Sequence, residues 1–285
     1  MPNPFPPTGE GSAPTVTPIA WKWDRLDSDT YFYFGGQRDG PLVLSVPGAP
    51  GDGTGGFNEY LARYLVDEGY AVGVLDWRGD FSRTAKPSKI VARAFADLAR
   101  LRRQSPQKFD PSRIILLGEG EGSFLAMLLS ADSSRLKIAD VPPPSICATV
   151  LRHPMNLDAT NVDSYLARRQ FLAEPGSPTD LSPLHYAASV PPTLIMTQQL
   201  DAADEKRGEI AATVLKAAGK TVLQTTDARF DAKNERTYFG WITNPATLKL
   251  GEFLRTYCPA KRARTPEARP RVLRKARAAR SRPLP

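Results

Sequence analysis

The sequence predicts an α/β protein with a mostly parallel sheet and helices on both of its faces. Short apolar runs of strand length alternate along the chain with segments whose apolar residues recur at helical spacing. The central unit is an apolar run at 113–117 that turns through several glycines directly into a helix-forming run. Strands that alternate with helices pair in parallel, because each crossover helix covers one face of the sheet. The 285 residues are enough to bury one sizeable core of this kind.

The first half of the chain opens with β-structure and then alternates. Aromatic residues at 21–23 and 30–34 favour two antiparallel edge strands. A continuous apolar run at 42–46 is typical of a strand buried on both faces, and Gly69 ends the helix that follows it. After the edge strands we expect, in chain order, a strand at 42–46, a helix at 57–65, a strand at 70–76, a helix at 91–101 and the strand at 113–117.

The second half continues this alternation around one insertion. Ile210, Val214 and Ala217 share one helical face, and Gly219 ends their helix. We expect, in chain order, a strand at 147–151, a cap-like insertion at about 155–190 with a short helix at 161–173, a strand at 192–197, the helix that ends at Gly219, a strand at 221–225 and a helix at 250–257. The predicted organisation is a proline-rich leader at 1–18, one domain at 19–260 and a basic tail at 261–285.

The turn after the central strand carries glycine at positions 118, 120 and 122. Glycines at alternate positions permit positive φ and close packing of helix on strand, as a nucleophile elbow G-x-S-x-G requires. In a hydrolase the central position holds a serine, whereas Gly120 has no side chain that could be acylated. The pattern therefore predicts the backbone of an elbow without its nucleophile.

A dinucleotide-binding turn is the alternative interpretation of these residues. Gly118, Gly120 and Ser123 nearly fit the pattern G-x-G-x-x-G/A. Glu119 and Glu121, however, would place negative charge where a pyrophosphate must lie on the helix N-terminus. The hydrolase-type elbow is the favoured interpretation, and nucleotide binding stays open.

From about 41 to 257 the sequence resembles the α/β-hydrolase superfamily, particularly its esterase and prolyl-oligopeptidase-like branches. The string Asp76-Trp77-Arg78-Gly79, followed by Ser82, is similar to the turn after the fourth strand of that family. The string at 109–114 is similar to the segment that leads into the elbow in that family. The string at 182–186 is similar to another stretch that is common there. The resemblance implies an α/β-hydrolase-type sheet over the domain at 19–260.

The resemblance also implies where a catalytic triad would lie. The nucleophile position is Gly120, the acid position after the seventh strand is Asp201, and the histidine position is nearest Arg229. Arginine stays protonated and cannot act as the base, so the implied triad is degenerate. We expect Ser123 to be a structural residue at the helix start, and His153 and His185 to be satisfied loop or packing histidines.

These residues predict a catalytically inactive α/β-hydrolase-like protein that acts as a structural or accessory subunit of a larger assembly. The alternatives are an active carboxylesterase-type hydrolase with rearranged catalytic residues and a nucleotide-binding protein. We expect no cofactor and no metal.

The positive charge of the chain is concentrated in the tail. The whole chain carries +8, whereas residues 261–285 carry +9, which leaves −1 for the remainder. We therefore expect the tail to dock on RNA, an acidic protein surface or another anionic partner. Its basic residues are Lys261, Arg262, Arg264, Arg269, Arg271, Arg274, Lys275, Arg277, Arg280 and Arg282.

The remaining composition bears on the compartment. The only cysteines, Cys147 and Cys258, are too few for a disulfide framework and have no metal-ligand spacing. We therefore expect reduced thiols and an intracellular, reducing compartment, cytoplasmic or organellar. No transit peptide is recognisable in the leader, and no apolar run reaches membrane-spanning length.

Overall fold

The computed structural model describes residues 22–25, 31–36, 40–48, 59–76, 96, 109–120, 122–130, 146–155, 157, 182–198, 201–227 and 244–260. The leader at 1–18, the helix expected at 161–173 and the basic tail at 261–285 lie outside these residues. Of the helix expected at 91–101, only residue 96 is described, and it is helical.

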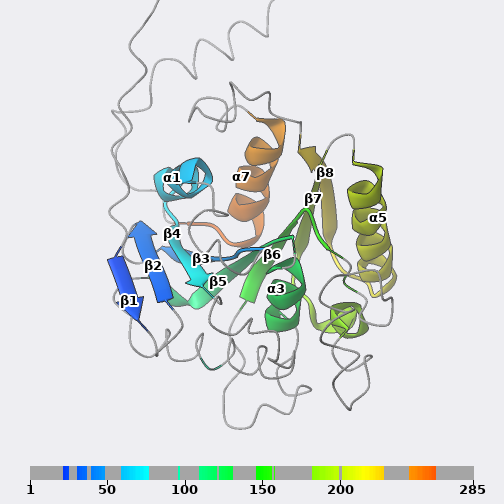
Figure 1. Ribbon diagram of the computed structural model, residues 1–285, viewed down its shortest axis with the longest axis horizontal. Coiled ribbons are helices and arrows are strands. Elements are labelled where there is room, and N and C mark those ends of the chain that lie inside the picture. Colours follow the sequence, from blue (N-terminus) through cyan, green and yellow to red (C-terminus); the bar gives the residue numbers. More distant parts are fainter. Residues whose placement is uncertain are drawn as a thin grey trace, which may run out of the picture.

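One sheet contains the eight strands of the described residues, in the order β1-β2-β4-β3-β5-β6-β7-β8 (Figure 1). The two contacts of β2, with β1 and with β4, are antiparallel, and all other neighbours pair in parallel. The mostly parallel sheet with an antiparallel aromatic edge is thus confirmed. The strands are β1 (Lys22–Arg25), β2 (Tyr31–Gly36), β3 (Pro41–Val46), β4 (Ala71–Asp76), β5 (Asp110–Glu119), β6 (Ile146–Arg152), β7 (Thr193–Gln198) and β8 (Val222–Asp227).

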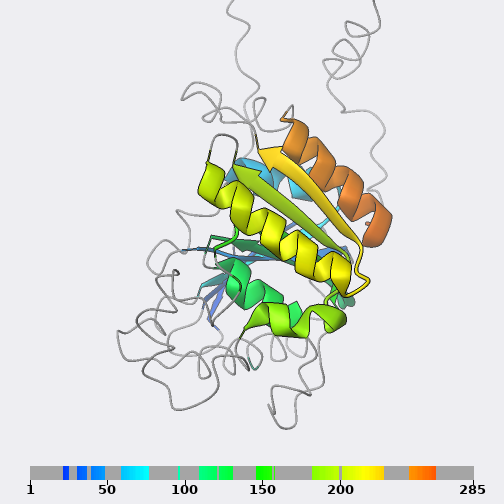
Figure 2. The same ribbon diagram turned by 90° about the vertical axis from the view of Figure 1, so that its right-hand side faces the viewer.

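Helices cover both faces of the sheet (Figure 2). On one face lie α1 (Glu59–Asp67) and α7 (Pro245–Tyr257), and on the other lie α3 (Gly122–Ser130) and α5 (Ala202–Ala217). A 3-10 helix, η4 (Pro183–Ser189), packs against α3 and α5. Because both faces are covered, the sheet separates two apolar cores rather than facing water on one side.

Central strands divide their side chains between these two cores. In β3, Leu42 and Leu44 join the core under α3 and α5, whereas Val43 joins the core under α1 and α7. In β5, Leu116 and Leu117 divide in the same way. Successive side chains of a strand point to opposite faces, so a strand that is buried on both faces has a nearly continuous apolar run. This explains the apolar runs at 42–46 and 113–117.

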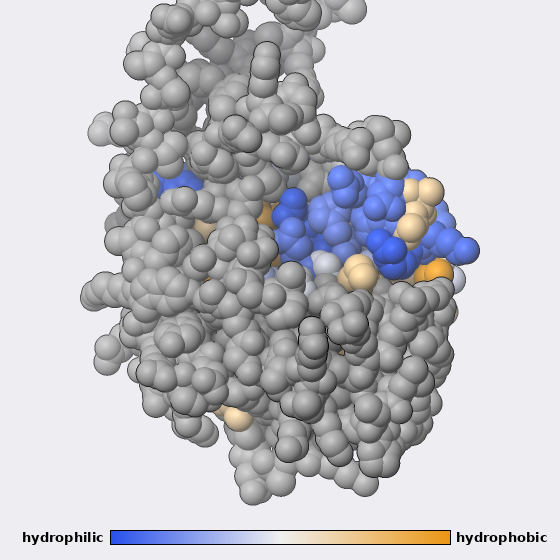
Figure 3. All heavy atoms as spheres, viewed as in Figure 1, coloured by the Kyte–Doolittle hydropathy of each residue, from blue (hydrophilic) through white to orange (hydrophobic). Residues whose placement is uncertain are grey.

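The buried side of α5 differs from the side that the sequence predicts. Ile210 is 46 % exposed, and Ala217 is exposed as well. The helix instead buries small residues, such as Gly208 and Ala211, together with Leu215. A Cβ at Gly208 would collide with the Thr197 side chain of β7, so at this position the helix lies too close to the sheet for a larger residue. The exposed side of α5 is largely hydrophilic (Figure 3).

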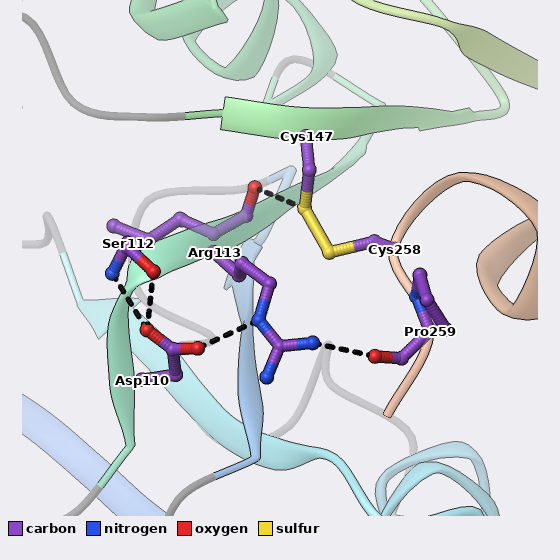
Figure 4. Close-up of a disulfide and its surroundings, with 7 residues drawn as sticks. Asp110, Ser112, Arg113, Cys147, Cys258 and Pro259 are labelled. Atoms are coloured by element: carbon purple, nitrogen blue, oxygen red, sulfur yellow. Dashed lines mark hydrogen bonds and ion pairs between the residues drawn. A yellow bond between two sulfur atoms is a disulfide. The ribbon is translucent and has the colours of Figure 1, made fainter. Parts of the chain in front are cut away.

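The expectation of two reduced cysteines is wrong. Cys147, near the amino end of β6, forms a disulfide with Cys258, which directly follows α7 (Figure 4). Their Cα atoms lie 5.7 Å apart, within the usual range for a disulfide. A separation of 111 residues hides this pairing in the sequence, since only the packing of α7 on the sheet brings the two residues together. Disulfides persist in oxidising compartments, so the cysteines no longer support a reducing one.

Ion pairing reinforces the same corner of the molecule. The Arg113 guanidinium donates to the Asp110 carboxylate and to the Pro259 carbonyl, each at 2.6 Å (Figure 4). The start of β5 is thereby joined to the segment that leaves α7.

In the described part of the chain, no helix is both long and apolar enough to cross a membrane.

Candidate functional site

The elbow backbone that the sequence predicts is present. β5 ends at Glu119, Gly120 lies in the turn with φ +54°, and α3 begins at Gly122. A positive φ is rare for residues other than glycine. Glycine is therefore the expected residue at position 120 when no functional side chain is needed there. The strand-turn-helix prediction is therefore confirmed.

The glycines on either side of Gly120 are fixed by close packing. A Cβ at Gly118 would lie 2.5 Å from the Ser123 Cα, and one at Gly122 would collide with the Val46 carbonyl oxygen. Gly120 differs, because the nearest described atom to a Cβ there would be the Gly48 Cα at 3.6 Å, an ordinary contact. Among the described residues, position 120 therefore has room for a side chain that the sequence does not supply.

Ser123 does not replace the missing nucleophile. It is fully buried in the first turn of α3, and its hydroxyl donates to the Gly118 carbonyl at 3.0 Å. This contact ties the start of the helix to the end of β5, as the sequence predicts for a structural serine.

Asp201, at the implied acid position, caps a helix. Its Oδ1 accepts hydrogen bonds from the backbone N–H groups of Ala203, at 3.1 Å, and Asp204, at 3.0 Å, at the start of α5. This satisfies two of the free donors of the first turn. Arg229, nearest the implied histidine position, lies outside the described residues.

A partly buried ion pair lies beside the elbow. Glu119 and Arg152 are register partners at the ends of β5 and β6, and their side chains meet at 2.9 Å. The Gly120 N–H donates to the carbonyl oxygen of the same Arg152 at 2.9 Å. The Glu119 charge is thus compensated by Arg152 at the edge of the sheet.

A second polar contact was missed by the sequence analysis. His153 follows β6 directly, and its Nδ1 lies 3.1 Å from Oδ2 of Asp204 in the first turn of α5. The same Asp204 oxygen accepts the Gln198 N–H at 2.6 Å. Both residues follow the carboxyl ends of adjacent parallel strands, β6 and β7, which meet at one edge of the sheet. That shared edge was the signal available in the sequence.

Asp204 is held as a carboxylate. Its burial by itself would raise the pKa, but hydrogen bonds from His153 and the Gln198 N–H, and the positive charge of Arg207, bring the pKa below its usual value. Arg207 lies 3.6 Å from the other carboxylate oxygen and donates to the Pro154 carbonyl at 3.0 Å. The pair His153–Asp204 is therefore a histidine oriented by a buried, ionised carboxylate.

The other histidine has a different environment. His185 lies exposed in η4, and its ring packs edge-on against Tyr186 with ring centres 5.6 Å apart. This agrees with the expected loop histidine. Within the described residues, no three His, Cys, Asp or Glu side chains gather as a metal site would need.

No protein-family model and no curated protein matches the sequence. The structure, however, is similar to solved esterases. Esterase 2 of Thermogutta terrifontis, phosphorylated by paraoxon, has a TM-score of 0.63 and 20 % identity over 86 % of this chain and 96 % of its own. Esterase B of Lactobacillus rhamnosis has a TM-score of 0.64 and 17 % identity over 86 % of this chain and 88 % of its own. The chain has the α/β-hydrolase fold.

In the α/β-hydrolase fold, the described elbow and the ends of β6 and β7 form one edge of the sheet. Ligands of open α/β sheets bind outside the carboxyl ends of the strands, which is the edge that carries Gly120, Arg152 and His153. The native form of the Thermogutta esterase 2 agrees equally well, with a TM-score of 0.64 over 90 % of this chain and 97 % of its own. The likeness, at 19 % identity, is one of fold.

Proposed function

We propose that this chain is an α/β-hydrolase-fold protein that forms no acyl-enzyme at its elbow and serves as an accessory subunit of a larger assembly. The observation that carries the proposal is Gly120. Its φ of +54° is a strained conformation for other residues, and the described surroundings leave room for a side chain. A glycine there provides the bend but no nucleophilic oxygen.

The second support is the distribution of charge. The tail at 261–285 carries +9 against −1 for the rest of the chain, so electrostatic attraction to an anionic partner is confined to the tail. The disulfide at Cys258 fixes the segment from which the tail departs. In this proposal, the tail docks on RNA or on an acidic protein surface of the assembly.

The elbow part is tested by covalent labelling. The intact chain is treated with a fluorophosphonate probe, which reacts with activated serines, and labelled peptides are identified by mass spectrometry. We expect no serine to be labelled. A labelled serine near the elbow would overturn the proposal.

The docking part is tested by removing residues 261–285. The truncated chain should keep its melting temperature and lose association with the assembly. Affinity of the full chain should fall steeply with salt if the partner is RNA, since each phosphate contact releases counterions. A truncated chain that still associates normally would contradict the docking role.

A hydrolase with rearranged catalytic groups is the second candidate. The contact between His153 and Asp204 favours it, because general-base chemistry uses an imidazole that a carboxylate orients. Within the described residues, no comparable contact favours nucleotide binding.

A further inference from the structure

We propose that the outer edge of β8 is an interface through which two copies of this chain pair as a two-fold dimer. In that dimer the β8 strands of the two copies lie antiparallel, so that one sheet continues through both molecules. This interface is independent of the elbow chemistry and of the partner of the basic tail. Three features of the described residues support it: the position of β8 in the sheet, its composition and the charges of α5.

β8 is the last strand of the sheet order, and among the described residues it pairs only with β7. In Figure 2 this edge faces the viewer, and β8 runs between α5 and α7. Successive residues of a strand direct their backbone N–H and C=O groups to opposite sides, and the Thr221 carbonyl accepts the Thr193 N–H of β7. Val222, Gln224 and Thr226 therefore direct theirs away from β7, where no described group pairs with them.

The composition of β8 does not protect this edge from pairing. Natural sheets protect their open edges with lysine, proline, a bulge or a very short strand. β8 is six residues long, contains neither lysine nor proline, and pairs with β7 in one continuous register. The strand at the opposite edge, β1, has only four residues, and three of them are charged. Because the side chains of Gln224 and Thr226 are exposed, the edge of β8 is accessible to a further strand.

A second copy brings a helix as well as a strand to this edge. α5 packs on both β7 and β8. A two-fold axis perpendicular to the sheet places both α5 helices on the same face, about two strand spacings or roughly 10 Å apart. Helices pack against each other at about 8–10 Å, so the two α5 helices would be in contact. An extended peptide would supply only its own strand, so a second copy is the occupant that uses the whole edge.

The side of α5 that borders the outer edge is acidic in its first half and basic at its end. Lys216 lies on that side, because its Nζ donates to the Oε1 of Gln224 in β8 at 3.4 Å. Glu205 and Glu209 precede Lys216 by about three and about two helical turns, so they lie on the same side. These three side chains are exposed, and Lys220 follows the helix as a half-exposed second cation. We call Glu205, Glu209, Lys216 and Lys220 the charged stripe.

Antiparallel pairing of two copies brings opposite charges of the charged stripe together. The two α5 helices of the dimer run in opposite directions, so the acidic half of one stripe lies beside the basic end of the other. The two-fold axis makes each such contact occur twice. The macrodipoles of antiparallel helices also attract each other. A parallel alignment would instead place like charges side by side, so the charges of α5 select the antiparallel arrangement.

The first test measures the mass of the full-length chain by sedimentation equilibrium at about 0.15 M salt, which screens repulsion between the basic tails. We expect a reversible equilibrium between one chain and two. Gln224→Pro removes a donor that points outward and leaves the hydrogen bonds to β7 in place. Because the dimer loses that donor twice, the dissociation constant should rise by about 10-fold or more. A wild type that is monomeric at its highest soluble concentration, or a variant that dimerises like the wild type, would overturn the interface.

A second test exchanges surface charges and leaves the backbone of β8 unchanged. Glu209→Lys and Lys216→Glu should each raise the dissociation constant by about 3-fold or more, because each places like charges together twice. The double variant with both exchanges should regain much of the wild-type affinity, since opposite charges meet again. Lys206→Glu is the matched control, because Lys206 is exposed on α5 but lies off the charged stripe, and it should leave the constant unchanged. Additive losses in the double variant, or an equal loss in the control, would overturn the antiparallel arrangement.

Discussion

The two ends of the parallel strands are held by different kinds of interaction. At the amino ends, the Cys147–Cys258 disulfide and the Asp110–Arg113 pair join the sheet to the segment after α7. At the carboxyl ends, contacts between backbones shape the elbow, and His153, in the segment bonded to Gly120, contacts the buried Asp204. A covalent bond and an arginine thus join segments at one end, while close backbone packing and a side-chain hydrogen bond shape the other. Variants at each end should therefore fail in different ways.

Removing the disulfide should give the largest loss of stability. The bond closes a loop of 111 residues, and the lost entropy of the unfolded chain over a loop of this length stabilises the fold by about 5 kcal/mol. The double variant Cys147→Ala/Cys258→Ala should therefore unfold at a lower urea concentration than the wild type. The elbow should keep its structure. Equilibrium unfolding measures the loss. Reduction of the wild type should lower its unfolding midpoint similarly, and a reducing agent without effect would show that the bond contributes little.

Gly118→Ala should have a large effect at the carboxyl ends. The new Cβ would lie 2.5 Å from the Ser123 Cα, so strand and helix must separate, at a loss of about 3 kcal/mol. Gly120→Ala is the matched control on the same turn. The alanine there has no close contact, and only its positive φ lowers the stability, by about 1 kcal/mol. Thermal unfolding of the two variants gives the comparison, and equal melting temperatures would contradict the packing argument.

Asp204→Asn should lower stability by about 2 kcal/mol at neutral pH, because it weakens the hydrogen bonds of a buried carboxylate. The folded-state pKa of Asp204 is lowered, so the carboxylate stabilises the fold above its unfolded pKa of about 3.9 and loses this effect as pH falls through the lower, folded pKa. The difference between wild type and variant should thus shrink in strong acid. Urea unfolding from pH 7 to the acid limit tests this, and a difference that grows there would contradict it.

Arg113→Ala should have the smallest effect, below about 1 kcal/mol. The Arg113 and Asp110 side chains are about a quarter exposed, and pairs that water reaches contribute little. The same disulfide would still hold the segment after α7. Added salt should weaken the wild type by a comparable amount, as measured by thermal unfolding. A loss as large as that of the disulfide variant would mean that the ion pair, rather than the covalent link, joins these segments.

Local patterns were sufficient for the framework of the fold. Largely apolar runs marked β3 and β5 because both strands are covered on both faces, and the spacing of Gly118, Gly120 and Gly122 located the elbow. The exposed Ile210 shows where periodicity fails. On α5 the close approach of Gly208 to β7, rather than side-chain size, decides which side of the helix is buried.

Contacts between distant segments could not be derived in this way. Cys147 meets Cys258 only after α7 packs across the sheet, and neither residue has a local pattern that indicates a partner. His153 and Asp204 each follow a predicted strand, yet their contact depends on β6 and β7 being neighbours and on where α5 begins. The candidate site was therefore located by its elbow but not by its polar groups.

The disulfide also determines how the molecule would bear a mechanical load. If the tail at 261–285 is attached to a partner, a pull on it reaches Pro259, which is bonded to Arg113, and then Cys258, from which it passes through the sulfur atoms into β6. That strand is hydrogen-bonded to β5 on one side and to β7 on the other. Tension is thus shared by two parallel ladders instead of peeling α7 away from the sheet. The domain can remain folded while it is tethered under strain.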